Sequence, residues 1–107
     1  MTRERDAKGA ASIDVLRARI EKADDVLLAL LQRRMRLARA IGRAKQAAGL
    51  PVLDPAREAR VVRRVATQAR ELGMPAEEVR SLFWSIIALC RTEQINARAG
   101  YAPRAPR

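Results

Sequence analysis

The sequence predicts an all-α domain of three helices, with a long first helix, that pairs with a second copy of itself. Alanine, leucine, arginine and glutamate dominate the chain, and these residues favour helix over strand. No stretch alternates polar and apolar residues with a period of two, whereas apolar residues recur at helical spacing over most of the chain. A chain of 107 residues folded into three helices buries only a thin core, so we expect it to associate.

The first predicted helix begins at Ile13, with Ser12 as its N-terminal cap, and runs to about Ala48. Its apolar residues form a heptad seam, which is the pattern of a coiled coil. The two seam positions hold Ile13, Ile20, Leu27, Arg34, Ile41 and Ala48, and Leu16, Ala23, Leu30, Leu37 and Ala44. A helix of this length spans roughly 54 Å, which is longer than so small a domain is wide. The seam therefore needs a partner chain to cover it, and the sequence favours a homodimer.

Two shorter helices are predicted after the first. Gly49 ends the first helix, and Asp54 and Pro55 begin the second, because Asp caps helices well and proline suits the first helical position. Gly73 ends the second helix, and Pro75 lies near the start of the third. The expected inner stripes are Glu58, Val61, Val62, Val65, Ala69 and Leu72, and then Val79, Leu82, Phe83, Ile86, Ile87, Cys90, Gln94 and Ala97. The domain is expected to span residues 12–98, between disordered tails at residues 1–11 and 99–107.

Composition excludes several classes of site. The chain has no histidine, which removes the commonest general base and most zinc sites, so we expect neither a metal nor a cofactor. The single cysteine, Cys90, cannot form an internal disulfide, and the residues show no apolar leader or membrane-spanning run. We therefore predict a cytoplasmic protein with no membrane partner.

The net charge of +10 indicates an anionic partner. A nucleic acid is one candidate, because basic proteins commonly neutralise phosphates, and a small acidic metabolite is the other. Nucleic-acid binding needs an exposed cluster of cations and usually aromatic residues that stack on bases, and neither is apparent. A basic helical dimer that binds nucleic acid and a pure dimerisation module stay as alternatives. We favour the metabolite and expect no nucleic-acid partner.

Polar residues occupy positions where the helical pattern calls for apolar ones. Arg34 holds a seam position, and Lys45 follows three turns later on nearly the same face. Glu58 and Gln94 lie on the inner stripes of the second and third helices. One inward polar residue is ordinary, but four from three helices need partners that an apolar stripe does not supply. A bound anion would satisfy the two cations among them.

Each of these residues also has a simpler interpretation. Arg34 suits a dimer whose register it fixes by pairing with a partner glutamate. Glu58 suits the first turn of a helix through the helix dipole, and Gln94 suits an exposed position late in a helix. Cys90 is most simply a core residue. Arg17 lies roughly 25 Å from Arg34 along the helix, too far to share one small ligand unless an antiparallel partner helix brings it across.

Five pieces of sequence occur in a fixed order along the chain. They are Leu16-Arg17-x-x-Ile20-x-x-x-Asp24, Leu30-Leu31-x-x-Arg34, Ile41-Gly42-x-x-Lys45, Pro51-Val52-x-Asp54-x-x-Arg57-Glu58, and Leu82-Phe83 followed by Gln94. This set, which covers about residues 13–97, resembles the all-helical class of chorismate mutases. The resemblance implies an intertwined antiparallel homodimer of three-helix chains. It also implies conversion of chorismate to prephenate, a step of the shikimate pathway that serves tyrosine and phenylalanine biosynthesis.

The resemblance further implies a role for each site residue. Arg34 and Arg17 of the partner subunit would hold the substrate carboxylates. Lys45 would meet a carboxylate and the ether oxygen, and Gln94 would meet the same oxygen, so that Arg34, Lys45 and Gln94 form the catalytic set. Glu58 would accept a hydrogen bond from the ring hydroxyl. The remaining substrate-binding residues would be Asp54, Arg57 and Cys90. Cys90 stands where the family often has a serine, and a thiol is a weaker hydrogen-bond donor than a hydroxyl.

The implied reaction agrees with the composition. A concerted rearrangement of chorismate needs no nucleophile, proton transfer or metal, so the absence of histidine is no obstacle. Two related activities fit the same scaffold as alternatives: isochorismate pyruvate lyase, and a mutase acting on the 4-amino analogue of chorismate.

Overall fold

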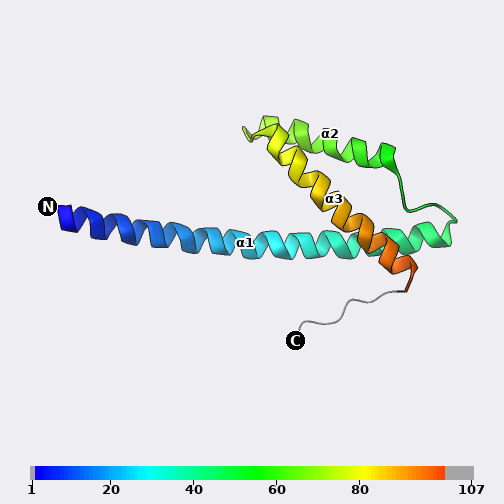
Figure 1. The fold of residues 1–107 in the computed structure, drawn as a ribbon, viewed down its shortest axis with the longest axis horizontal. Helices are drawn as coiled ribbons and strands as arrows, with labels where there is room; N and C mark the ends of the chain where they lie inside the picture. Colours follow the sequence, from blue (N-terminus) through cyan, green and yellow to red (C-terminus); the bar gives the residue numbers. More distant parts are fainter. Residues whose placement is uncertain (1, 101–107) are drawn as a thin grey trace. The chain divides into compact units, whose positions relative to one another are not determined.

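The structure, a computed structural model, describes the backbone of residues 2–100 and the side chains of residues 9, 10 and 12–100. Its elements are α1 (Thr2–Ala47), α2 (Pro55–Glu71) and α3 (Ala76–Arg98) (Figure 1). No strand occurs among residues 2–100. The predicted all-α fold with a long first helix is confirmed. No helix in this part of the chain combines the length and the low polarity needed to cross a bilayer.

The predicted start of the first helix is wrong. α1 begins at Thr2 rather than at Ile13, so the predicted capping role of Ser12 does not arise. Residues 2–11 contain no proline and consist mostly of alanine and charged residues, so nothing in them stops the helix from extending towards the N-terminus. A helical backbone over residues 2–11 differs from the disordered tail expected there. The domain limits at residues 12 and 98 stay predictions, and residues 1 and 101–107 lie outside the described part.

Both predicted glycine stops are confirmed by their backbone angles. Gly49 and Gly73 adopt positive φ values of 69° and 70°, a region that residues with a Cβ atom rarely enter. The backbone N–H of Leu50 then donates to the carbonyl of Lys45 at 2.8 Å, which satisfies one of the last carbonyls of α1. The residue after Gly73 makes the same kind of bond at the end of α2. Each glycine thus ends one helix and turns the chain towards the next.

The described residues divide between Arg33 and Arg34 into two compact units, and each is described by itself. In the first unit the seam residues of α1 are exposed. Ile13, Leu16, Ile20, Leu27 and Leu30 are each 49–63% exposed. A regular apolar stripe left open to water on one chain is what a partner helix would cover.

In the second unit, α2 packs along α3 (Figure 1). The buried hydrophobic side chains described in this unit are mostly small, which lets helices approach closely; they are Ala38, Val62, Ala66, Ala69, Ile87 and Cys90. Leu72 and Leu82, predicted on the inner stripes, are instead 74% and 58% exposed. Leu72 lies beyond the last residue of α2, where the chain turns at Gly73. Beside Leu82, the neighbouring Phe83 is the better buried of the pair.

The last turns of α1 lie against α3 at Gly42. A Cβ atom on Gly42 would lie only 2.7 Å from the backbone oxygen of Gln94, so a hydrogen atom is all that fits there. One turn earlier, Arg39 Nη1 donates to Glu93 Oε2 at 3.1 Å, with the two side chains 18% and 13% exposed. The close approach and the ion pair together fix how α3 sits on α1.

We expect Gly42→Ala to lower the free energy of unfolding. Alanine gains about 1 kcal/mol in helix propensity, but forcing its methyl group against the backbone of Gln94 costs about 1–3 kcal/mol. Gly9→Ala is the matched control in the same helix, because a Cβ atom there meets nothing within 4 Å. Urea unfolding should show Gly42→Ala below Gly9→Ala by about 1–3 kcal/mol. Equal stability of the two variants would contradict the close approach.

Candidate active site

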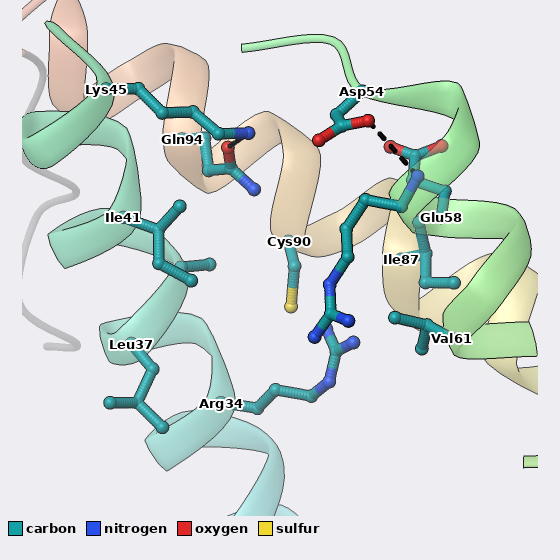
Figure 2. Close-up of a pocket in the computed structure, with 12 residues that line it drawn as sticks. Arg34, Leu37, Ile41, Lys45, Asp54, Glu58, Val61, Ile87, Cys90 and Gln94 are labelled. Carbon is teal, nitrogen blue, oxygen red and sulfur yellow. Dashed lines mark hydrogen bonds between the residues drawn. The ribbon is translucent and has the colours of Figure 1, made fainter. Parts of the chain in front are cut away.

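A cavity of about 510 Å³ opens in the second unit, in the size range of small-molecule sites (Figure 2). Its apolar wall consists of Leu37, Ala38, Ile41, Val61 and Ile87. Its polar wall consists of Arg34, Lys45, Asp54, Arg57, Glu58, Cys90 and Gln94. All three helices of this unit and the residue that caps α2 contribute to it.

Every site residue predicted from the sequence lines this cavity except Arg17. The inward polar residues that break the apolar pattern therefore gather around one space. Arg17 lies on α1 in the first unit, where it is exposed. Its part in a site shared between two subunits stays a prediction.

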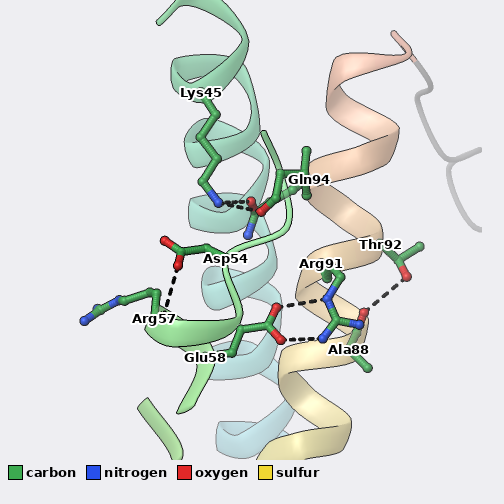
Figure 3. A network of polar contacts seen from close by, with 9 residues as sticks. Lys45, Asp54, Arg57, Glu58, Ala88, Arg91, Thr92 and Gln94 are labelled. Carbon is green, nitrogen blue, oxygen red and sulfur yellow. Dashed lines mark hydrogen bonds and ion pairs between the residues drawn. The ribbon is translucent and has the colours of Figure 1, made fainter. Parts of the chain in front are cut away.

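Lys45 and Gln94 form one polar end of the cavity. Lys45 Nζ donates to Gln94 Oε1 at 2.9 Å and to the backbone oxygen of Val52 at 2.8 Å (Figure 3). An ammonium group has no acceptor, so the amide of Gln94 must turn its oxygen towards Lys45. The amide NH₂ is then left to donate elsewhere, and Lys45 keeps a third N–H. This pair is thus arranged to present donors to an oxygen atom in the cavity.

Asp54 has a structural partner of its own. Its carboxylate accepts a hydrogen bond from the backbone N–H of Arg57 at 3.1 Å, which caps α2 as the sequence predicts (Figure 3). The cap holds the carboxylate at the N-terminus of α2. The first turn of this helix then places Arg57 and Glu58 in the cavity wall.

Glu58 has a partner that the sequence analysis missed. Arg91 Nε donates to Glu58 Oε2 at 2.9 Å, and Arg91 Nη2 donates to Glu58 Oε1 at 2.5 Å (Figure 3). The hydrogen bonds that Arg91 donates to Glu58, aided by the negative charge of the carboxylate, raise the pKa of Arg91 above its ordinary value. The inward carboxylate was itself a signal that the facing helix supplies a cation. Choosing Arg91 over Arg80 or Arg98 requires the register of α2 against α3, which spacing does not give.

The charge around the cavity is positive on balance. Arg34, Lys45 and Arg57 are cations, and the carboxylates are Asp54 and Glu58. Each carboxylate already accepts hydrogen bonds from the protein, one from a backbone amide and the other from a guanidinium. The cavity is therefore suited to an anion with more than one carboxylate.

Cys90 lies in the wall of the cavity and is buried (Figure 2). In the described part of the chain, no three histidine, cysteine, aspartate or glutamate side chains gather where they could share a metal ion.

Comparison with known proteins places these features in a family. The sequence pattern of type II chorismate mutases matches residues 16–95. A 4-amino-4-deoxychorismate mutase of Streptomyces pristinaespiralis is 34% identical over 85% of this chain and 71% of its own length. An intracellular chorismate mutase of Mycobacterium tuberculosis is 37% identical over 63% of this chain and 60% of its own length.

A solved structure has the same fold. This conserved hypothetical protein from Pyrococcus furiosus is 32% identical, with a TM-score of 0.64 over 78% of this chain and 95% of its own. The chain spans 25% or less of the length of longer curated relatives, which include a 3-dehydroquinate dehydratase of Pyrobaculum aerophilum.

Proposed function

The chain belongs to the type II chorismate mutase family, and from that premise we propose that it converts chorismate to prephenate by a concerted Claisen rearrangement. In this reaction the ether C–O bond breaks while a new C–C bond forms, and no group is transferred to the protein. The protein must hold a flexible dianion in the compact conformation in which the two carbons meet, and stabilise the charge that develops.

The observation that carries the proposal is the pairing of Lys45 with Gln94 at the cavity wall. As the ether bond breaks, negative charge grows on its oxygen. The one remaining N–H of Lys45 and the NH₂ group of Gln94 are donors already held at the cavity wall, where they would meet that oxygen. Donors already oriented for developing charge stabilise the transition state more than the ground state.

The other lining residues have roles that fit a dianion. Arg34 would hold one substrate carboxylate with the two parallel bonds that a guanidinium can make. Glu58 would accept a hydrogen bond from the ring hydroxyl. Asp54 and Arg57 would line and order the site. Cys90 would give a weak contact where many family members have a serine.

The second carboxylate is assigned to Arg17 of the partner subunit. The support is the exposed seam of α1, whose apolar residues a second copy of the helix would cover. An antiparallel copy would bring Arg17 of the partner subunit towards the cavity. Arg17 of the same chain is too far from Arg34 along the helix to share one ligand with it. The dimer is then required for a complete site and not only for stability.

Two related activities stay as alternatives on the same scaffold, and one of them is represented among the relatives. The Streptomyces pristinaespiralis relative is named for the 4-amino analogue of chorismate, and a carboxylate such as Glu58 can accept from an ammonium as well as from a hydroxyl. Isochorismate pyruvate lyase is the other.

Purified protein should consume chorismate and release prephenate, and it should do so faster than it acts on isochorismate or on 4-amino-4-deoxychorismate. The measurement is kcat/KM for the three substrates with one preparation, with product identified by mass spectrometry and by its conversion to phenylpyruvate in acid. A preparation that leaves all three unchanged, and instead binds DNA with a steep salt dependence, would contradict the proposal.

Lys45→Ala and Gln94→Ala should each lower kcat by about 10²- to 10³-fold, because each removes a donor to the ether oxygen. Arg43→Ala is the matched control, since Arg43 is an exposed cation of the same helix that does not line the cavity. Circular dichroism should show all three variants folded. Turnover near that of the unmodified protein in both Lys45→Ala and Gln94→Ala would contradict the roles assigned to them.

Mixing two inactive variants tests the shared site. Arg17→Ala and Arg34→Ala should each be nearly inactive alone. If Arg17 acts across the dimer, a mixed dimer has one site with both changes and one site with neither. Refolding equal amounts together should therefore restore about a quarter of full activity. No recovery in verified mixed dimers would place Arg17 outside the partner's site.

A further inference from the structure

We propose that Arg91 is a positioning residue that makes the cavity select a substrate with a neutral hydroxyl over one with an ammonium at the ring position facing Glu58. The inference rests on the proposed function and specifies its substrate. It concerns a residue outside the cavity wall that acts through one inside it.

The first step is the geometry of the pair. Arg91 engages both oxygens of Glu58, through Nε at 2.9 Å and Nη2 at 2.5 Å. A guanidinium that bonds both oxygens holds a carboxylate in one orientation, because rotation of the carboxylate breaks both bonds. The side chains are 33% and 17% exposed for Arg91 and Glu58, so the pair is partly shielded from water.

The second step is the side from which Arg91 approaches. Glu58 lines the cavity, whereas Arg91 is not among the described residues that line it. Figure 3 shows the two side chains facing each other between α2 and α3, with Arg57 extending away from them. A carboxylate offers about four acceptor positions, and Arg91 uses two of them. Glu58 therefore keeps acceptor capacity for a donor inside the cavity.

The third step is electrostatic. A carboxylate with a guanidinium at its back presents a much smaller net charge to the cavity than a lone carboxylate does. A hydroxyl needs only an oriented acceptor, so it loses little from the presence of Arg91. An ammonium depends on the net charge, and it is attracted to Glu58 while being repelled by Arg91. The pair thus favours chorismate over its 4-amino analogue.

The contrast with another ion pair of α3 supports a specific role for Arg91. Arg80 and Glu77 pair at 3.7 Å with side chains 42% and 76% exposed, as expected of a surface pair with little energetic consequence. Arg91 instead reaches from one helix to a carboxylate of another that forms part of the cavity wall. Arg80 is therefore the matched control.

The test compares kcat/KM for chorismate and 4-amino-4-deoxychorismate in four proteins: the unmodified chain, Arg91→Gln, Arg91→Lys and Arg80→Gln. The unmodified chain should prefer chorismate. Arg91→Gln keeps a donor but removes the charge, and should lower the chorismate preference by at least about tenfold, equivalent to about 1.4 kcal/mol. Arg91→Lys, which keeps the charge, and Arg80→Gln should keep the preference within about threefold of the unmodified value.

A further variant keeps the test decisive if Arg91→Gln does not fold. Glu58→Gln leaves Arg91 as an uncompensated cation behind the cavity wall, so it should raise the preference for chorismate while lowering activity.

Equal losses on both substrates in Arg91→Gln would reduce Arg91 to a structural residue and overturn the inference, as would an unmodified chain that prefers the 4-amino analogue. Neither outcome affects the assignment of Lys45 and Gln94. Failure of the unmodified chain to convert either substrate would overturn the proposed function and the inference together.

Discussion

The close contact of α1 with α3 at Gly42 is the constraint on which the rest of the site depends. Because a hydrogen atom occupies the place of a side chain, the two backbones approach so closely that a Cβ atom at position 42 would overlap the Gln94 carbonyl oxygen. Lys45 lies one turn further along α1 and Arg39 one turn earlier, so the first reaches Gln94 and the second reaches Glu93. A wider spacing would separate Lys45 from Gln94, and the polar end of the cavity would lose its fixed orientation.

Much of the fold follows from local chemistry that the sequence displays. Asp54 with Pro55 begins α2, and Gly49 and Gly73 end helices through the positive φ that glycine permits. These signals are local, so they can be recognised in the sequence without knowledge of the tertiary structure. The start of α1 lacks such a signal, because residues 2–11 contain neither a strong stop nor a proline. Helix propensity alone then decides where the helix begins. The exposure of Leu72 and Leu82 depends on where a helix ends and how helices pack, which periodicity does not specify.

The candidate site was predictable to the extent that its residues break a pattern. Arg34, Lys45, Glu58 and Gln94 are conspicuous because each replaces an apolar residue on an inner face, and the structure brings them to one cavity. Arg91 breaks no pattern, because a charged residue beside an inner stripe is common. Its role can be recognised only from the packing of α2 on α3, which places it against Glu58, 33 residues away in sequence. Residues that act through another residue are therefore the ones that sequence reasoning misses.

The bond from Lys45 to the backbone oxygen of Val52 makes the connection between α1 and α2 part of the chemistry. A backbone carbonyl is present whatever side chain that position carries, so substitutions at position 52 leave the acceptor in place. Changes in the length of the connection do not, because they displace the carbonyl and the ammonium group bound to it. Position 52 therefore tolerates substitution, whereas the connection does not tolerate a change in its length. An insertion there would alter the site without replacing any residue that meets the substrate.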